Sequence, residues 1–318
     1  MLQICVECAQ EYACEKVSME KVNIDKCPIC GSTDISRALT CVDHSVSGEM
    51  FHLCRCGQCS FLFTQGFPDK TSMSRYLRMP DYSSLTDSHH GLVNKLFYRV
   101  RRHMLKEKAR VVERATHRDS GRLLDIGTGV GDFAGYMAHR GWRVEAVEKD
   151  ADARGLAQER YALEVKPRSA LNRYEAHSFD AITLWQVMQD MPSINEMWDR
   201  LHALLTPGGA LIVAVPNCSS FDARKYGAYW AAYDVPRHLW HFTPDSIQRI
   251  AQRHGFVMRE HRPMPFDAFY VSILTERYMR HNLPFVRGML TGVLSWMAAL
   301  SRKERSSSMI YVFRIKNG

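Results

Sequence analysis

Apolar runs of strand length alternate with amphipathic segments between residues 119 and 217. The runs with the pattern of buried strands are RLLDI, WRVEAVEKD, LEVKP, FDAITLWQV and ALIVAVP. Between the last two, INEMWDRLHALL repeats its apolar residues at helical spacing. Strands that alternate with helices in this way predict a parallel sheet covered by helices.

Further helical and strand patterns flank this region. DSIQRIAQRHGF at 245–256 predicts a helix that ends at a glycine, and MIYVFRI at 309–315 predicts a last strand. Upstream, residues 71–118 have a helical pattern, and residues 95–118 are rich in Lys and Arg. We interpret this basic stretch as a solvated helix face, with an anionic-substrate or RNA-binding face as the alternative.

The longest uncharged apolar run, GMLTGVLSWMAAL at 288–300, is too short to span a bilayer. We expect it to pack on the core, with a lid or a lipid-facing surface as the alternative. The N-terminus has no apolar segment of the secretory type, so we expect a cytoplasmic protein. The net charge of +8 is compatible with an acidic partner but does not require one.

Nine of the ten cysteines precede residue 60, and two C-x2-C pairs stand out among them. Cys27 and Cys30 form the first pair, and Cys56 and Cys59 form the second. Four thiolates suit the tetrahedral coordination of zinc and leave no open position, so the pattern predicts a structural zinc site. We expect Gly31 and Gly57 to provide positive φ in the two tight turns.

Other cysteines leave the ligand set open at this stage. Cys54 and Cys41 are possible replacements for one ribbon ligand, whereas the cysteines before residue 15 have no second pair. The predicted organisation is therefore an N-terminal extension (1–26), a zinc ribbon (27–66), a helical linker or cap (67–118) and a sheet domain (119–318).

A glycine-rich loop, Gly127 to Gly131, follows the first strand of the predicted sheet. Ligands of such sheets lie beyond the carboxyl ends of the strands, where glycines let the backbone approach closely. Glu148 ends the next strand, the position from which a carboxylate binds a ribose diol. The loop therefore predicts a nucleoside-containing ligand.

The charges around this loop discriminate between two such ligands. Asp125 and Asp132 bracket the glycines, and two carboxylates would repel the pyrophosphate of a dinucleotide. They are tolerated beside the ammonium and sulfonium groups of S-adenosylmethionine. We therefore favour S-adenosylmethionine over NAD.

Residues 122–217 resemble a class I S-adenosylmethionine-dependent methyltransferase. The resemblance is carried by LLDIGTGVGDF, Glu148, FDAITLWQVMQDM and LLTPGGALIVAVPN, in that order. With CPICGS, DYSSLTDSHHGLVNKL and WAAYDVPRHLWHFTPDSI, the chain resembles bacterial ubiquinone-methylase-like enzymes with an N-terminal zinc ribbon. This resemblance implies a Rossmann-like seven-stranded sheet with an antiparallel last strand. The predicted cofactor-binding residues are Asp125, Gly127, Thr128, Gly129, Gly131, Glu148, Trp185 and Gln186.

The chain departs from these relatives within its fourth motif. Where they tend to read W-H-V-L-E-H, residues 185–190 read WQVMQD, so both histidines and the glutamate are replaced. If one of those histidines is a base in the relatives, this chain uses another group or none.

We expect the methyl acceptor to meet the segment after the fifth strand, which combines aromatic and titratable side chains. His238 or His241 is the candidate general base, with Asp234 orienting it. The alternative is an internally bonded loop with an Asp234–Arg237 pair and buried histidines. Upstream, Tyr82, His89 and His90 are candidates to cap the cofactor. We expect Cys218 to be a packed side chain rather than a nucleophile.

Three functions are compatible with these patterns. We favour methyl transfer to an oxygen or carbon nucleophile of a small molecule of the quinone, lipid or sugar type, and a peripheral membrane contact is compatible with it. The second is an RNA methyltransferase that holds nucleic acid with the ribbon and the basic helix. The third is a non-catalytic scaffold, suggested by the altered fourth motif.

Overall fold

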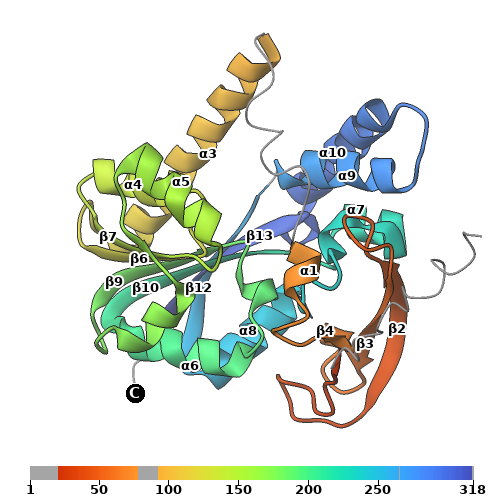
Figure 1. Cartoon of the computed structure of the whole chain (residues 1–318), viewed down its shortest axis with the longest axis horizontal. Helices are drawn as coiled ribbons and strands as arrows, with labels where there is room; N and C mark the ends of the chain where they lie inside the picture. The colour runs from red at the N-terminus through yellow and green to blue at the C-terminus, as the bar shows by residue number, and fades with distance from the viewer. Residues whose placement is uncertain (1–20, 78–91, 265, 317–318) are drawn as a thin grey trace, which may run out of the picture.

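The computed structural model describes residues 21–77, 92–264 and 266–316. Within these residues, a seven-stranded sheet with helices on both faces lies beside a smaller four-stranded sheet (Figure 1). The predicted cap residues Tyr82, His89 and His90 lie outside the described part of the chain, as does most of the predicted extension.

The strands of the large sheet lie in the order β12-β13-β10-β9-β6-β7-β8. Their bounds are β6 (Arg122–Ile126), β7 (Arg143–Val147), β8 (Val165–Lys166), β9 (Phe179–Trp185), β10 (Leu205–Pro216), β12 (Phe256–Pro263) and β13 (Ser308–Ile315). β13 is antiparallel to both neighbours, and the pairs from β10 to β8 are parallel. The predicted seven-stranded sheet with an antiparallel last strand is confirmed.

Two details differ from the sequence-based expectation. The sequence pattern does not predict the edge strand β12, because this strand has several charged residues and is only partly buried. β10 begins before the predicted strand ALIVAVP, since it includes the TPGG segment, and its register shifts between Leu205 and Ala210.

Helices cover both faces of the large sheet (Figure 1). On one face lie α3 (Leu92–Thr116) and α4 (Asp132–His139), and on the other lie α6 (Ile194–Leu204) and α8 (Pro244–Arg253). Successive strand residues point to opposite faces, so Leu123 packs with the α3 side and Leu124 with the α6 side. The core is therefore two apolar layers separated by the sheet.

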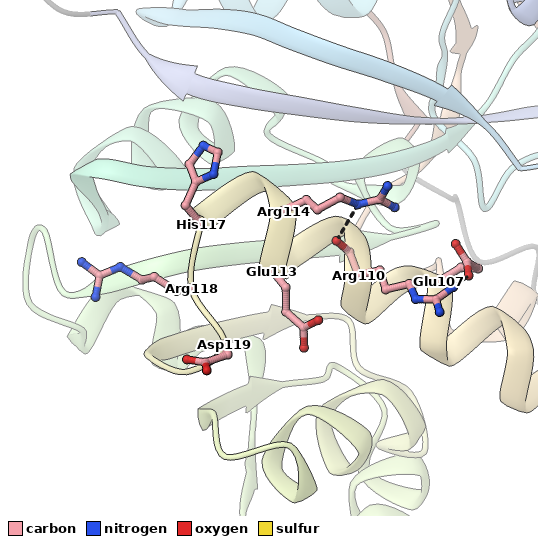
Figure 2. Close-up of a pocket in the computed structure, with 7 residues that line it drawn as sticks. All are labelled: Glu107, Arg110, Glu113, Arg114, His117, Arg118 and Asp119. Atoms are coloured by element: carbon pink, nitrogen blue, oxygen red, sulfur yellow. Dashed lines mark hydrogen bonds and ion pairs between the residues drawn. The ribbon is translucent and has the colours of Figure 1, made fainter.

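The last turns of α3 have one packed and one exposed side. Ala109, Val111 and Val112 are buried against the sheet. An open surface concavity lies beside the exposed side (Figure 2). It is lined by Glu107, Arg110, Glu113, Arg114, His117, Arg118 and Asp119.

The other short elements connect these layers. The α-helices are α1 (Ser74–Leu77), α5 (Ala151–Tyr161) and α7 (Phe221–Tyr226). The 3-10 helices are η1 (Arg168–Arg173), η2 (Met188–Asp190), η3 (Gly227–Tyr229), η4 (Ala231–Tyr233) and η5 (Lys303–Arg305).

The small sheet takes its fourth strand from a distant part of the chain. Its order is β11-β4-β3-β2, with β2 (Ile35–Val42), β3 (Met50–Cys56), β4 (Leu62–Gln65) and β11 (Trp240–His241). A separate pair joins β1 (Lys21–Val22) to β5 (Phe67–Pro68). The N-terminal ribbon is thus completed by the segment predicted to meet the acceptor.

Helices α9 (Asp267–Tyr278) and α10 (Pro284–Ser301) form a closely packed hairpin. A Cβ at Gly288 would lie 2.4 Å from the Cα of Ile273, so the two backbones nearly touch. The 288–300 run therefore packs on the protein only through small and polar residues on one side of α10. Its large apolar side chains are exposed, which differs from the expected packing of this run on the core. Among the described residues, no helix combines the length and the hydropathy needed to cross a membrane.

Candidate functional site

The glycine loop between β6 and α4 turns through three positive φ angles, at Gly127, Gly129 and Gly131. Two of these glycines are also required by packing. A Cβ at Gly127 would lie 2.4 Å from Val187 Cγ2, and one at Gly131 would lie 2.8 Å from Ala157 Cβ. At Gly129 a Cβ would meet no atom within 4 Å, so this residue borders open space.

Glu148 lies beside this open position. Its Oε2 accepts a hydrogen bond from the Gly129 amide at 2.9 Å, and its Oε1 accepts one from the Asp150 amide at 3.0 Å. Because a carboxylate offers about four acceptor sites, Glu148 retains capacity for two hydroxyl donors. The structure therefore brings the predicted ribose acid next to the predicted loop.

The two acids that bracket the loop differ in their surroundings. Asp125 is buried and accepts a 2.7 Å hydrogen bond from Thr183, and burial raises its pKa despite this bond. Asp132 is paired with Arg101 and accepts a 2.6 Å hydrogen bond from the Tyr161 hydroxyl. Both surroundings weaken the charge argument for a cationic ligand, because burial favours the uncharged form of Asp125 and Arg101 compensates the charge of Asp132.

Polar atoms without partners gather where β9 ends. The Nε1 of Trp185 and the Oε1 of Gln186 are buried with no hydrogen-bond partner among the described residues. The Nε2 of Gln186 donates to Asp267 at 2.7 Å, which fixes the amide. The ammonium of Lys108 lies 4.7 Å from the centre of the Trp185 ring. Buried groups of this kind are satisfied by a ligand or water.

These observations fit S-adenosylmethionine. The unfilled space at Gly129 borders Glu148, and β6 and β9 are adjacent strands whose carboxyl ends carry the glycine loop and the unsatisfied Trp185 and Gln186 groups. An adenosine with ribose hydroxyls and an amino acid moiety supplies the missing donors and acceptors.

The four predicted zinc ligands come together in the ribbon. The sulfurs of Cys27, Cys30, Cys56 and Cys59 all lie within 4.8 Å of one another. Cys27 Sγ is 3.5 Å from Cys59 Sγ, and Cys30 Sγ is 3.4 Å from Cys56 Sγ. Zinc–thiolate bonds of about 2.3 Å in a tetrahedron imply sulfur separations of about 3.8 Å. The cluster thus suits a four-thiolate zinc ion.

The surrounding residues answer two questions that the sequence left open. Cys54 and Cys41 are buried outside the four-sulfur cluster. Gly31 has the expected positive φ of 77°, but Gly57 does not, and Ser60 has a φ of 59° in the second turn. Gly57 is needed for space instead, since a Cβ there would lie 1.9 Å from an Asp34 carboxylate oxygen.

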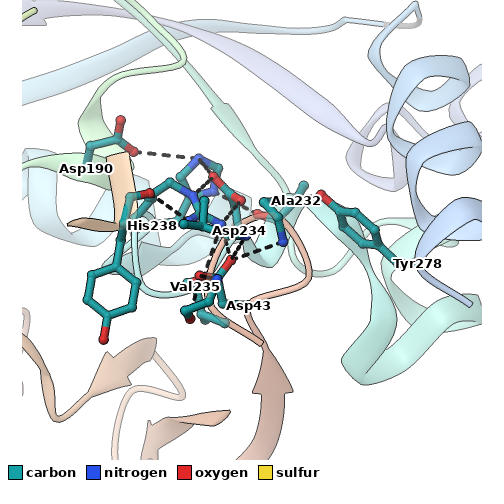
Figure 3. A network of polar contacts seen from close by, with 12 residues as sticks. Asp43, Asp190, Ala232, Asp234, Val235, His238 and Tyr278 are labelled. Atoms are coloured by element: carbon teal, nitrogen blue, oxygen red, sulfur yellow. Dashed lines mark hydrogen bonds and ion pairs between the residues drawn. The ribbon is translucent and has the colours of Figure 1, made fainter. Parts of the chain in front are cut away.

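A buried network anchors the segment predicted to meet the acceptor (Figure 3). Arg237 pairs with Asp43 of the ribbon at 2.8 Å and with Asp234 at 2.7 Å, and it donates to the Tyr76 carbonyl at 3.0 Å. Burial alone would raise the pKa of Asp43, but Arg237 and the Ser47 donors outweigh it and lower the pKa. The Asp234–Arg237 pair of the alternative interpretation is therefore present.

His238 lies between this network and the loop after β9. Its Nδ1 is 2.9 Å from the Ala232 carbonyl, which can only accept, so Nδ1 carries the proton in the neutral ring. Its Nε2 is 3.6 Å from Asp190 Oδ1 and 3.9 Å from Asp234 Oδ2. The imidazole is thus oriented by Ala232, and Asp190 is a closer carboxylate than Asp234.

His241 has a different environment. It is 4% exposed, and its Nε2 is 3.0 Å from the hydroxyl of Thr64 in β4. Burial lowers its pKa to about 3. His241 is therefore a neutral core residue that joins the ribbon to the acceptor segment. Cys218 is also enclosed, and burial raises its pKa to about 12.

Asp190 is the residue that the sequence reasoning did not include in the site. Burial raises its pKa, opposed by His238 and Lys149. The available signal was its position, because it replaces the last histidine of the relatives' fourth motif. The backbone supports the pairing, since the Leu239 amide donates to the Gln189 carbonyl at 2.8 Å.

Several proteins to which the chain is distantly similar are named as methyltransferases. The chain is 28% identical over 159 residues to ubiquinone biosynthesis O-methyltransferase of Nitrobacter winogradskyi, covering 46% of this chain and 61% of that protein. The Aeromonas salmonicida protein of the same name is 25% identical over 153 residues, with 44% and 64% covered. The solved geranyl diphosphate C-methyltransferase from Streptomyces coelicolor has 15% identity and a TM-score of 0.49, covering 74% of this chain and 89% of that one.

A family model described as a methyltransferase domain matches residues 98–261, slightly more than half of the chain. The match runs from α3 to β12 and includes the glycine loop, Glu148 and the acceptor segment. It confirms the predicted enzyme class, in which S-adenosylmethionine is the methyl donor. The chain belongs to the methyltransferase domain family.

Proposed function

We propose that this chain transfers the methyl group of S-adenosylmethionine to an oxygen or carbon nucleophile of a small-molecule acceptor, of the quinone, lipid or sugar type. The observation that carries the proposal is His238, whose Nε2 lone pair faces Asp190 in η2, the 3-10 helix that follows β9. β9 is adjacent to β6, which leads into the glycine loop. A basic nitrogen and the donor site thus share one edge of the sheet.

The donor side consists of the glycine loop and Glu148. Glu148 would bind the ribose hydroxyls, Gly129 would leave room for the ligand, and Asp125 would supply a carboxyl group for its cationic end. Trp185 and Gln186 supply the remaining polar contacts at the end of β9. S-adenosylmethionine supplies a methyl group already activated by the sulfonium, so these residues mainly orient it for in-line displacement.

The acceptor side of the site consists of His238, Asp190 and Asp234, and its role is to remove a proton from the acceptor. His238 Nε2 takes it from a hydroxyl or an acidic carbon as the nucleophile attacks, while Nδ1 remains bound to the Ala232 carbonyl. The carboxylates of Asp190 and Asp234 then stabilise the imidazolium. Asp190 and His238 together take the place of the histidines that are missing from the fourth motif.

The zinc ribbon has a structural role in this proposal. A zinc ion held by Cys27, Cys30, Cys56 and Cys59 has no open position, so it takes no part in methyl transfer. It fixes β3 and β4, and Thr64 of β4 donates to the His238 carbonyl at 2.8 Å. We also propose a cytoplasmic location, because unpaired structural thiols suit a reducing compartment.

The described surface does not favour the RNA alternative. The concavity beside α3 mixes three acidic residues with its basic ones (Figure 2). Arg110 is paired with Glu107, and Glu113 is paired with Arg140. A surface that grips phosphates leaves its cations free of such partners.

The test uses S-adenosylmethionine labelled in its methyl group with fractionated cell extract. We expect label in a small-molecule fraction, either apolar and extractable into organic solvent or polar and of low mass. Label in RNA or protein would overturn the proposed acceptor class. An absence of cofactor binding by calorimetry, with folded protein, would support the scaffold alternative instead.

A further inference from the structure

Helix α10 differs from an ordinary surface helix, because its large apolar side chains face outward and its small and polar residues face the protein. The side that packs on the protein consists of small and polar residues: Gly288, Thr291, Gly292, Ser295 and Ala299. Ser295 donates to Asp222 at 2.9 Å, and Lys225 donates to Thr291. The polar side of α10 is therefore satisfied within the protein.

The outward side of α10 carries large apolar side chains. Those at least 36% exposed are Phe285, Val286, Met289, Leu290, Val293, Leu294, Trp296, Met297 and Leu300. Isolated exposed leucines are ordinary, but a continuous apolar surface along one helix marks a binding surface. An 18-residue helix is about 27 Å long, and this surface runs along it.

The charges near this surface indicate what covers it. From Glu276 to Arg305 the chain has six Lys and Arg residues and two Glu, of which Glu276 pairs with Arg287 and Glu304 lies 3.2 Å from His261. Arg277 and Arg280 lie near the start of α10, and Arg302 and Lys303 follow its end, all with exposed side chains. An apolar helix side with cations at both ends is complementary to an anionic lipid surface.

A second copy of the chain fits less well. In a symmetric dimer formed through antiparallel α10 helices, the basic start of one helix would face the basic end of the other. Arg302 and Lys303 would approach Arg277 and Arg280 of the copy, with Glu304 as the one exposed acidic residue beside them. Like charges brought together in this way oppose association.

We propose that the outward side of α10 docks the protein peripherally on an anionic lipid bilayer. The helix lies parallel to the surface, with its apolar side chains among the acyl chains and its terminal arginines at the headgroups. The hairpin starts at Asp267, which is bonded to Gln186 of the candidate site. Docking through α10 therefore brings the site close to the membrane.

The test is co-sedimentation of the full chain with vesicles of phosphatidylcholine and phosphatidylglycerol, and with vesicles of phosphatidylcholine alone. We expect binding to the anionic vesicles that is weakened by 0.5 M salt. The double variant Leu290→Ser/Leu294→Ser should lose at least about tenfold in partitioning. The matched control is Leu156→Ser, which changes an exposed leucine of α5 and should bind as the wild type does.

Cofactor binding by each variant, measured by calorimetry, shows that it is folded. Failure to bind anionic vesicles, or equal binding by the double variant and the wild type, would overturn the proposal. Equal binding to neutral vesicles would overturn its electrostatic part. A lipid-free dimer in sedimentation velocity that the double variant abolishes would assign the surface to a second copy instead.

Discussion

The donor side and the acceptor side of the candidate site are built in different ways. The donor side uses residues close in sequence, since Gly129 and Glu148 belong to one strand–helix–strand unit. The acceptor side joins Asp43, Thr64, Asp190 and His238, which come from three distant segments. A local unit can be predicted from a motif, whereas an assembly of distant segments depends on the whole fold.

The ribbon is therefore part of the acceptor side and not a separate module. Its sheet includes β11, and its Asp43 and Thr64 bind the backbone and side chains around His238. Changes in the ribbon should therefore impair methyl transfer more than cofactor binding.

The largest effect is expected from His238→Gln, which removes the base and leaves the donor side intact. We expect methyl transfer to fall by about 10²- to 10⁴-fold, with the affinity for S-adenosylmethionine unchanged. Transfer from labelled cofactor and calorimetry measure the two quantities. His52→Gln, at an exposed ribbon position, is the control. Full activity of His238→Gln would remove the base from the mechanism.

Asp43→Asn should be the most destabilising of these changes. It takes one charged partner from buried Arg237, and the expected loss in the free energy of unfolding is about 3 kcal/mol. This is near the lower limit for breaking a buried ion pair, because Asp234 still pairs with Arg237. Urea denaturation compares it with Asp25→Asn, an exposed control. Equal stability of both variants would contradict the proposed anchoring.

Glu148→Gln tests the donor side by itself. Losing a charged acceptor for the ribose hydroxyls should raise the Kd for S-adenosylmethionine about 10- to 100-fold. The matched control is Glu145→Gln in β7, the strand that leads to Glu148, because the Glu145 carboxylate pairs with Lys166 instead. An unchanged Kd for Glu148→Gln would place the cofactor elsewhere.

The pH dependence of stability tests Asp190. Burial raises its pKa, opposed by His238 and Lys149, with Asp234 and Arg168 also nearby. A raised pKa means that the folded state holds its proton to higher pH, so this group costs stability as pH rises through its folded pKa. Asp190→Asn should therefore be more stable than the wild type at pH 8, and this gain should be absent at pH 4. Urea midpoints at both pH values measure this, and a gain at pH 4 alone would show the opposite sign.

The sequence was most informative where short-range pattern determines structure. The seven-stranded sheet, the four clustered cysteines and the proximity of Glu148 to the glycine loop all follow from periodicity and spacing. Gly57 shows a limit of this reasoning, since it is needed for space near Asp34 and not for positive φ.

The acceptor side could not be predicted to the same degree. His238 and His241 are three residues apart in similar sequence surroundings, yet one faces Asp190 and the other is sealed against Thr64. Their difference arises because residues 240–241 join the ribbon sheet as β11, and no local pattern reveals that pairing. The sequence does not identify Asp190 as a site residue either, because its contact with His238 also joins distant segments of the chain.

The most direct test of the ribbon's role in the acceptor side is Thr64→Val. This near-isosteric change removes the hydroxyl that donates to the His238 carbonyl and contacts His241, with Thr40→Val in β2 as its control. We expect methyl transfer to fall about 5- to 10-fold while the Kd for S-adenosylmethionine stays unchanged. Unchanged transfer, or an equal loss of cofactor affinity, would contradict the assignment of the ribbon to the acceptor side.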